Sequence, residues 1–336
     1  MHLSTLLPLL ALSPLVSSLP LSRRQASAQG YPLPLAAVGP LSDIQDPSVC
    51  VGPTQTLYLL SSGEGLPVRT SSDGGSTWSA ATSLFPDELP DSVANCVAEG
   101  SSTALQGPDC TYFNETGEFA IVFSASKGTE KENAVFAVTT ADPLSGNWTD
   151  KGLVLESTAA TDYNAVSPHL VDVAGFPLYL SIGGNYSALR MTALKRSTYK
   201  PTSSELINQA VRPDNASIGS PFIFRTETPF SYWLLSTFDD PSISSLYPST
   251  LRIARSTRSL TDPYRAQNGG LMWDGEATTL LASHEGVHNP SSPSVWFEEG
   301  EGRWKIAYQY VDDSGRYQLG LNYLDFETED GWPVLA

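Results

Sequence analysis

The sequence predicts an all-β fold, a five-bladed β-propeller, from a long internal repeat, from the residue types in its apolar runs and from its turns. The 336-residue chain contains 26 glycines and 25 prolines, which is typical of a turn-rich β protein. No stretch shows sustained apolar periodicity of 3.6 residues, so long amphipathic helices are not expected. A β-sandwich is the alternative, but it needs turns about every 8–12 residues and does not explain a longer period.

Five aromatic and β-branched runs recur about every 55–70 residues and indicate the central strands of five similar units. They are Thr56–Ser62, Glu118–Ser126, Pro177–Gly183, Ser231–Phe238 and Arg303–Val311. A further run follows each of them and is expected to pair with it: Val68–Ser71, Ala134–Thr140, Leu189–Leu194, Leu251–Thr257 and Gln318–Leu324. Several strands followed by a turn with an aromatic residue are typical of a propeller blade.

A short segment that contains proline precedes each central strand. The five segments are Asp46-Pro47-Ser48-Val49, Pro108-Asp109-Cys110, Ser167-Pro168-His169-Leu170, Ser220-Pro221-Phe222-Ile223 and Ser292-Pro293-Ser294-Val295. The first strand of a propeller blade lines the central channel. Polar residues at these five starts are therefore expected to face one shared pocket, where loops carry function.

The N-terminus has the features of a targeting segment. Leu6–Val16 is apolar but shorter than the ~18 residues of a membrane span, and the dibasic pair Arg23-Arg24 follows it. We therefore expect residues 1–24 to be a signal peptide with a short pro-segment, and residues 25–336 to form one propeller domain. A disordered basic tail is the alternative interpretation.

Two further features agree with a secreted, extracellular protein. Asn-x-Ser/Thr sequons begin at four positions, Asn114, Asn147, Asn185 and Asn215. The three cysteines, Cys50, Cys96 and Cys110, fit one disulfide and one free thiol in an oxidising compartment. The sequence does not determine the pairing, although Cys96 and Cys110 would close the shortest loop.

The formal net charge of −17 repels nucleic acid and anionic lipid, so we expect neither as a partner. The protein is expected to be a monomer, and the resemblance described next implies an oligo- or polysaccharide as its partner.

Over nearly the whole mature chain, the sequence resembles glycoside hydrolase family 43, and especially its arabinanase-like branch. The segments that carry the resemblance are Ile44-Gln45-Asp46-Pro47-Ser48-Val49, Gly107-Pro108-Asp109, Asn164-Ala165-Val166-Ser167-Pro168-His169, Val287-His288-Asn289 and the closing Asp330-Gly331-Trp332-Pro333-Val334. The resemblance implies a five-bladed propeller that acts on plant cell-wall polysaccharide such as arabinan or arabinoxylan. It places Asp46 as the general base and Asp109, Asn164, Ser167 and His288 in the substrate-binding pocket.

The resemblance also implies that part of the family's catalytic set is missing. An inverting glycosidase needs two carboxyl groups about 6.5–9.5 Å apart, one to activate water and one to protonate the leaving oxygen. The family's general acid falls on Gly219, and the Asp that adjusts the pKa of that acid falls on Ser167. Neither residue can donate a proton as a carboxyl group does. Loss of a general acid typically costs ~10²–10⁴ in rate.

Two acidic residues are candidates for the missing acid. Glu285 lies three residues before His288, and Asp214 lies five residues before Gly219. Either is alternatively an ordinary solvated loop carboxylate, and Asp46 is alternatively a structural residue. In the family, the His at the position of His288 often approaches a calcium ion. No certain cofactor is expected, because one histidine without nearby carboxylates would bind calcium weakly and mostly through water.

Ser71-x-Asp73-x-Gly75-x-Thr77-Trp78 also fits the Asp-box of sialidase-type propellers, which is a structural turn. The box occurs once, and no arginine triad is evident at the channel strand starts, so a sialidase is disfavoured. Three hypotheses remain for the function: a hydrolase that uses Asp46 and a substituted acid, a carbohydrate-binding or effector-like propeller without hydrolysis, and a pocket reused for other small-molecule chemistry.

Overall fold

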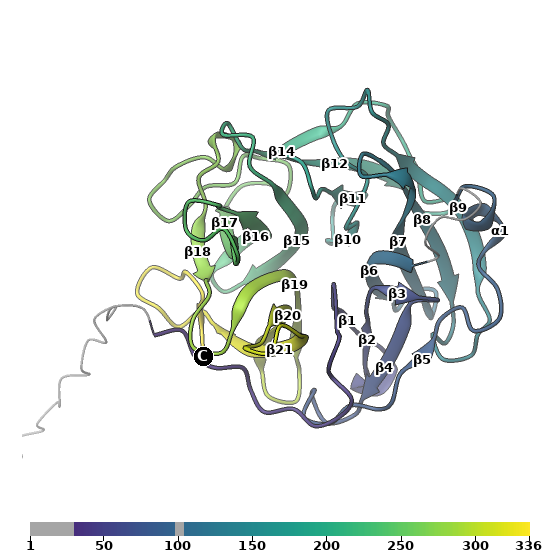
Figure 1. The fold of residues 1–336 in the computed structure, drawn as a ribbon, viewed down its shortest axis with the longest axis horizontal. Coiled ribbons are helices and arrows are strands. Elements are labelled where there is room, and N and C mark those ends of the chain that lie inside the picture. Colours follow the sequence, from purple (N-terminus) through teal and green to yellow (C-terminus); the bar gives the residue numbers. More distant parts are fainter. Residues whose placement is uncertain (1–29, 98–103) are drawn as a thin grey trace, which may run out of the picture. The chain divides into compact units, whose positions relative to one another are not determined.

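Five antiparallel sheets form a ring around a central channel in the computed structural model, which describes residues 30–97 and 104–336 (Figure 1). The predicted signal peptide and the Arg23-Arg24 pair lie outside the described residues. Residues 31–336 form a single unit. Within the described residues, no helix is long and apolar enough to cross a membrane.

The chain builds the blades in sequence order. Blade 1 contains β1 (Ser48–Val51), β2 (Leu57–Leu60), β4 (Pro67–Ser71) and β5 (Thr82–Ser83), with the 3₁₀ turn η1 (Pro53–Gln55). Blade 2 contains β6 (Ala104–Phe113), β7 (Glu118–Thr129), β8 (Glu132–Thr140) and β9 (Thr149–Glu156), with the short β3 (Gly63–Glu64) added at its inner edge. The one α-helix of the described chain, α1 (Asp91–Ala94), lies before β6.

The remaining blades repeat this plan. Blade 3 contains β10 (His169–Val171), β11 (Leu178–Ile182), β12 (Ala188–Lys195), β13 (Lys200–Pro201) and β14 (Ile207–Val211). Blade 4 contains β15 (Ile218–Glu227), β16 (Phe230–Asp239), β17 (Ser249–Ser256) and β18 (Thr278–Leu281), with η2 (Met272–Asp274) before β18. Blade 5 contains β19 (His288–Glu298), β20 (Arg303–Val311), β21 (Tyr317–Asp325) and β22 (Val334–Leu335).

The predicted five-bladed propeller is confirmed. The five predicted central strands are β2, β7, β11, β16 and β20, and the five runs that follow them are β4, β8, β12, β17 and β21. The innermost strands β1, β6, β10, β15 and β19 surround the channel, as expected (Figure 1). The proline segments lie at the start of β1 and β10 and inside β6, β15 and β19. The sequence did not reveal β14. This strand pairs with the first half of β12, and the pairing contains a bulge between Leu189 and Arg190.

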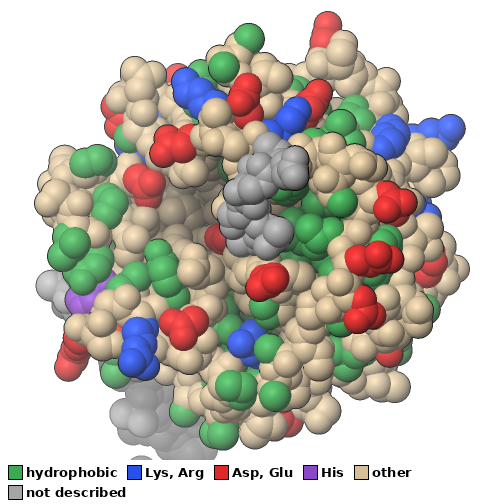
Figure 2. Space-filling view, turned by 45° about the vertical axis from the view of Figure 1, so that its right-hand side comes forward, with side chains coloured by type: hydrophobic (Ala, Val, Ile, Leu, Met, Phe, Trp, Pro, Cys, Tyr) green, Lys and Arg blue, Asp and Glu red, His purple; other side chains and the backbone are tan. Residues whose placement is uncertain are grey.

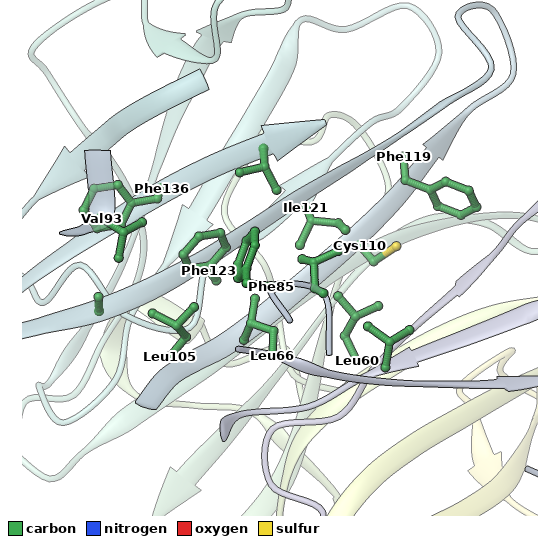
Figure 3. Close-up of a cluster of buried hydrophobic side chains, with 14 of the residues drawn as sticks. Leu60, Leu66, Phe85, Val93, Leu105, Cys110, Phe119, Ile121, Phe123 and Phe136 are labelled. Atoms are coloured by element: carbon green, nitrogen blue, oxygen red, sulfur yellow. The ribbon is translucent and has the colours of Figure 1, made fainter. Parts of the chain in front are cut away.

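Hydrophobic packing between blades follows from the alternation of side chains along each strand. In β7, Phe119, Ile121 and Phe123 pack toward blade 1, where Figure 3 shows Phe123 beside Phe85, whereas Ala120 and Val122 pack toward blade 3. Because successive strand residues point to opposite faces, each sheet is buried on both sides. One apolar cluster fills each of the five interfaces between neighbouring blades.

The ring closes where blade 5 meets blade 1. Trp78 and Leu59 of blade 1 pack against Trp296 and Leu321 of blade 5 in one of these clusters. The backbone N–H of Leu35, in the segment before blade 1, donates to the carbonyl of Leu321 at 2.7 Å. The N-terminal segment therefore lies along the outer part of blade 5 and helps to hold the two ends of the ring together.

The Asp-box is a structural turn at the outer edge of blade 1, as expected. Asp73 accepts hydrogen bonds from the Thr77 backbone N–H at 2.9 Å and the Thr77 hydroxyl at 2.6 Å. These bonds, with a further one from Ser71, lower the pKa of Asp73 to about 2. The indole N–H of Trp78 donates to the Gly75 carbonyl at 2.9 Å, which fixes the buried tryptophan in the interface with blade 5.

A disulfide joins Cys50 of β1 to Cys110 of β6, whose Cα atoms lie 5.5 Å apart. Cys96 is a free thiol. The sequence left the pairing open, and the ring determines it by placing two innermost strands, β1 and β6, side by side. The disulfide therefore connects blade 1 to blade 2 near the channel.

We predict that the Cys50→Ser variant loses about 2–4 kcal/mol of unfolding free energy, because the disulfide closes a loop of 60 residues in the unfolded chain. Urea unfolding of the oxidised protein, compared with the variant, measures this loss. Cys96→Ser is the matched control and should leave the unfolding midpoint nearly unchanged. A Cys96→Ser effect as large as that of Cys50→Ser would contradict the assigned pairing.

Candidate functional site

The five proline segments meet at the channel with the same local backbone. The residue before each proline has a positive φ: 46° at Asp46, 53° at Gly107, 45° at Ser167, 48° at Ser220 and 52° at Ser292. Such values are uncommon for residues other than glycine and persist only where the surroundings enforce them. The repeated kink brings the five residues together around one depression at the channel.

A cleft of about 550 Å³ opens above this ring of kinked residues. Most of its lining carries neutral hydroxyl or amide groups: Gln45, Ser62, Gln106, Ser167, Asn185, Ser217, Ser220, Thr237, Ser249, Asn289, Ser291, Ser292, Gln309 and Tyr317. Of the described lining residues, only Asp46 and Asp239 are ionisable carboxylic acids, and none is basic. Elsewhere acidic side chains are scattered over the surface, as Figure 2 shows for one face.

Asp46 lies at the centre of a hydrogen-bond network that spans several blades. Its Oδ2 accepts a hydrogen bond from Ser62 at 2.6 Å, and its Oδ1 accepts one from Ser292 of blade 5 at 2.7 Å. Its backbone N–H donates to Oε1 of Gln309, also in blade 5, at 2.6 Å. The Ser62 hydroxyl in turn accepts from the backbone N–H of Gly107 in blade 2 at 2.9 Å. Asp46 is half-buried and lines the cleft, where the sequence predicted the general base.

The network continues into blade 4. The hydroxyls of Ser292 and Ser220 lie 3.2 Å apart, and the backbone N–H of Ser292 donates to the Thr237 hydroxyl at 3.0 Å. The carboxylate of Asp46 is therefore connected to blades 2, 4 and 5 through hydroxyl groups.

Position 219, where the resemblance places the lost general acid, is closed by the backbone of blade 3. A Cβ atom at this position would lie 2.8 Å from the Cα of Gly184 and 3.1 Å from the carbonyl oxygen of Gly183. The carbonyl of Gly183 also accepts a hydrogen bond from the backbone N–H of Ser220 at 3.0 Å. Blades 3 and 4 touch at this point without a side chain between them.

The structure places Ser167 in the cleft and Asp109 at its base. Ser167 is half-buried, and a Cβ atom on the neighbouring Gly107 would lie 2.7 Å from the Ser167 Cα. Asp109 is 4% exposed. Its carboxylate accepts from the backbone N–H of Leu170 at 2.8 Å and lies 3.2 Å from Nδ1 of His169. Asp109 therefore ties blade 2 to blade 3 below the cleft.

Asn164, predicted to bind substrate, does not line the cleft. It is 1% exposed, and its carbonyl oxygen accepts from Asn133 at 2.7 Å and Ser157 at 3.1 Å. Its amide nitrogen donates to the backbone carbonyls of Glu130 and Gly184. These contacts use its polar atoms inside the protein, so the side chain is not available to a sugar.

His288 is not among the cleft-lining residues, although the next residue, Asn289, is. Its Nε2 lies 2.8 Å from the Asp313 carboxylate, and its ring stacks on Tyr247 with centroids 4.5 Å apart. Among residues 30–97 and 104–336, no group of three His, Cys, Asp or Glu side chains has the arrangement of a metal site. A calcium ion held mostly through water near His288 stays a prediction.

The two candidates for a substitute acid lie away from the cleft lining. Glu285 borders a separate depression, beside Leu33 and Tyr310. Asp214 forms an ion pair with Arg212, and this pairing lowers its pKa. The sequence analysis missed Asp239, whose carboxylate lines the cleft and accepts from the Ser249 hydroxyl at 2.6 Å. No local motif marks Asp239, because it follows an ordinary central strand.

Residues 40–333 match the model of glycosyl hydrolases family 43. The chain therefore belongs to family 43, and the resemblance stated from the sequence is confirmed.

Characterised relatives of similar length agree with this assignment. An extracellular endo-α-(1→5)-L-arabinanase of Bacillus subtilis is 30% identical over 284 residues, which cover 82% of this chain and 83% of that protein. An arabinan endo-1,5-α-L-arabinosidase C of Emericella nidulans is 26% identical over 290 residues, which cover 82% of this chain and 86% of that protein. The solved endo-arabinanase of Bacillus licheniformis superimposes with a TM-score of 0.75 at 30% identity, covering 89% of this chain and 99% of its own.

We predict that the double variant Gly219→Glu, Ser167→Asp does not gain arabinan hydrolysis. The new side chain at position 219 needs the backbone of Gly183 and Gly184 to move, and overpacking of this kind costs about 1–3 kcal/mol. Thermal unfolding and a reducing-sugar assay measure the two effects. Gly219→Ala is the matched control, since it introduces the Cβ without the carboxyl group. Substantial hydrolysis by the double variant at unchanged stability would contradict the closed position.

Proposed function

We propose that this protein is a secreted carbohydrate-binding member of family 43, which holds arabinan-type chains of the plant cell wall in the channel cleft and does not hydrolyse them by the family's two-carboxylate route. The observation that carries this proposal is the closed backbone contact at Gly219. A general acid must reach the leaving oxygen, and the blade 3 backbone occupies the space where a side chain at this position would start.

The chemistry of the cleft supports a neutral sugar as the ligand. Arabinan carries hydroxyl and ether oxygens but no charge, and the lining offers hydroxyl and amide groups that both donate and accept hydrogen bonds. The net charge of −17 disfavours a strongly anionic polysaccharide. The arabinan-directed activities of the relatives from Bacillus subtilis and Emericella nidulans support arabinan over other neutral chains.

Export is part of the proposal. The relative from Bacillus subtilis is described as extracellular, and the sequence of residues 1–24 is that expected of a signal peptide. The disulfide between Cys50 and Cys110 agrees with an oxidising compartment.

Hydrolysis through Asp46 and Asp239 is a second candidate function. It is favoured by one observation: these are the two carboxylic acids of the described cleft lining. Asp46 would serve as the base and Asp239 as the acid. The Thr237 hydroxyl accepts from the backbone N–H of Ser292, next to Asp46. Asp239 lies two residues further along β16, which is ~6.6 Å along the strand.

We predict that the protein binds linear arabino-oligosaccharides without releasing sugar, and that Asp46→Asn weakens binding only a few-fold. The Asn side chain retains the shape of Asp46; one of the two hydroxyls of Ser62 and Ser292 can still donate to its amide oxygen, and the other can turn to accept from its amide nitrogen. Isothermal titration calorimetry measures binding, and chromatography of a long incubation measures release of sugar.

Asp239→Asn and Glu285→Gln complete the experiment. Release of arabinose that both Asp46→Asn and Asp239→Asn abolish, and that Glu285→Gln does not change, would replace the binding proposal with the second candidate. Absence of both binding and hydrolysis would exclude arabinan as the ligand.

A further inference from the structure

The loop between β11 and β12, residues 183–187, carries a sequon that faces the cleft. Asn185, Tyr186 and Ser187 form an Asn-x-Ser sequence. Asn185 is exposed, and it is the one sequon asparagine of the four among the cleft-lining residues. Its φ of 51° lies in the left-handed region, which asparagine tolerates better than most residues.

Blade 4 and the residue that follows β14 hold this loop in place. The carbonyl oxygens of Gly183, Tyr186 and Ser187 accept hydrogen bonds from the backbone N–H groups of Ser220, Ile218 and Arg212, at 3.0, 2.9 and 2.7 Å respectively. With both sides of Asn185 fixed by backbone bonds, a group attached to its side chain would have a defined origin at the blade 3 side of the cleft. A flexible surface loop would allow such a group to swing away, but this loop is anchored.

We propose that Asn185 carries an N-linked glycan that occupies the blade 3 side of the cleft, so that the cleft accepts chain ends or short oligosaccharides and excludes the interior of a long chain. This inference rests on the proposed function, because it assumes export and a carbohydrate ligand. N-linked glycans are bulky and hydrophilic, so the first sugars compete for the volume that a through-running polysaccharide would need.

The modification needs a lipid-linked oligosaccharide diphosphate as the donor. The Nδ2 atom of Asn185 forms a bond to the anomeric carbon of the oligosaccharide, and the bond from that carbon to the diphosphate oxygen breaks. The lipid diphosphate leaves with the bonding electron pair, and the amide gives up one proton to the transferring enzyme. No other residue of the cleft takes part in this step.

The sequon at Asn114 provides a matched control within the same chain. Asn114 lies in the turn between β6 and β7, whereas Gln106, near the start of β6, lines the cleft. Asn114 therefore lies at the other end of β6, and a glycan there cannot reach the cleft lining. Thr116→Ala removes this sequon, and Ser187→Ala removes the sequon of Asn185 without changing Asn185 itself.

The test uses the full chain secreted from a eukaryotic host with N-glycosylation. Glycopeptide mass spectrometry should find Asn185 occupied in the wild type and free in Ser187→Ala. Binding is then measured with two probes, arabinotriose and soluble debranched arabinan. We expect Ser187→Ala to bind the polymer at least about tenfold more tightly than the wild type, with a much smaller change for arabinotriose. Thr116→Ala should match the wild type with both probes.

Each outcome decides between the two proposals. An unoccupied Asn185, or equal polymer affinity of the wild type and Ser187→Ala, would overturn the inference while leaving the proposed function in place. If Ser187→Ala binds neither probe, the proposed function itself fails. Asn185→Asp, which keeps a side chain tolerated at positive φ, should reproduce Ser187→Ala and excludes an effect of the serine hydroxyl.

Discussion

The closure between blade 5 and blade 1 is the constraint on which the ring depends. In the described chain, every strand of blade 1 and of blade 5 comes from that blade's own stretch of sequence, so no strand from the C-terminal end completes the first blade. The first and last blades are held by side-chain packing around Trp78 and Trp296, by the N-terminal segment along blade 5, and by the hydrogen bonds of Asp46. Polar contacts at the channel are therefore part of the architecture as well as of the cleft.

The carboxylate of Asp46 has a structural role in the closure of the ring. Its two oxygens accept from hydroxyls of blades 1 and 5, and its backbone binds Gln309. A half-buried carboxylate that accepts such bonds stabilises the contact it spans, whereas a side chain without acceptors would leave both hydroxyls without their partner. The presence of an aspartate at the predicted base position is therefore not by itself evidence of hydrolysis, because ring closure uses the same group.

The sequence predicted the fold well because the information it needed was local. Alternating apolar residues define runs such as Glu118–Ser126, and the repeat of these runs fixes the number of blades. The residues before proline, including Asp46 and Ser167, were placed correctly at the channel because the start of an innermost strand is a local feature. The pairing of Cys50 with Cys110 depends on which innermost strands are neighbours in the ring. The number of residues between two cysteines does not contain this information.

Prediction of the site was less complete because a motif gives a segment but not the direction of each side chain. Asn164 and Ser167 belong to one motif, yet the first is enclosed by Asn133 and Ser157 and the second lines the cleft. Asp239 belongs to no motif. It lines the cleft because it is the last residue of β16, and this strand ends at the cleft. These assignments follow from packing between segments that are distant in sequence.

The closed contact at Gly219 involves the packing of its neighbours as well as Gly219 itself. Gly184 approaches Gly219 closely, and a Cβ atom at position 184 would itself lie 2.8 Å from Val166. The two glycines therefore depend on each other, since a side chain at either would separate blade 3 from blade 4 or displace Val166. The backbone of Gly183 and Gly184 lies where a side chain at position 219 would start, and the hydrogen bonds that hold it there also fix the position of Asn185 at the cleft. One packing arrangement thus both closes the position predicted for the acid and determines which groups the cleft presents to a sugar.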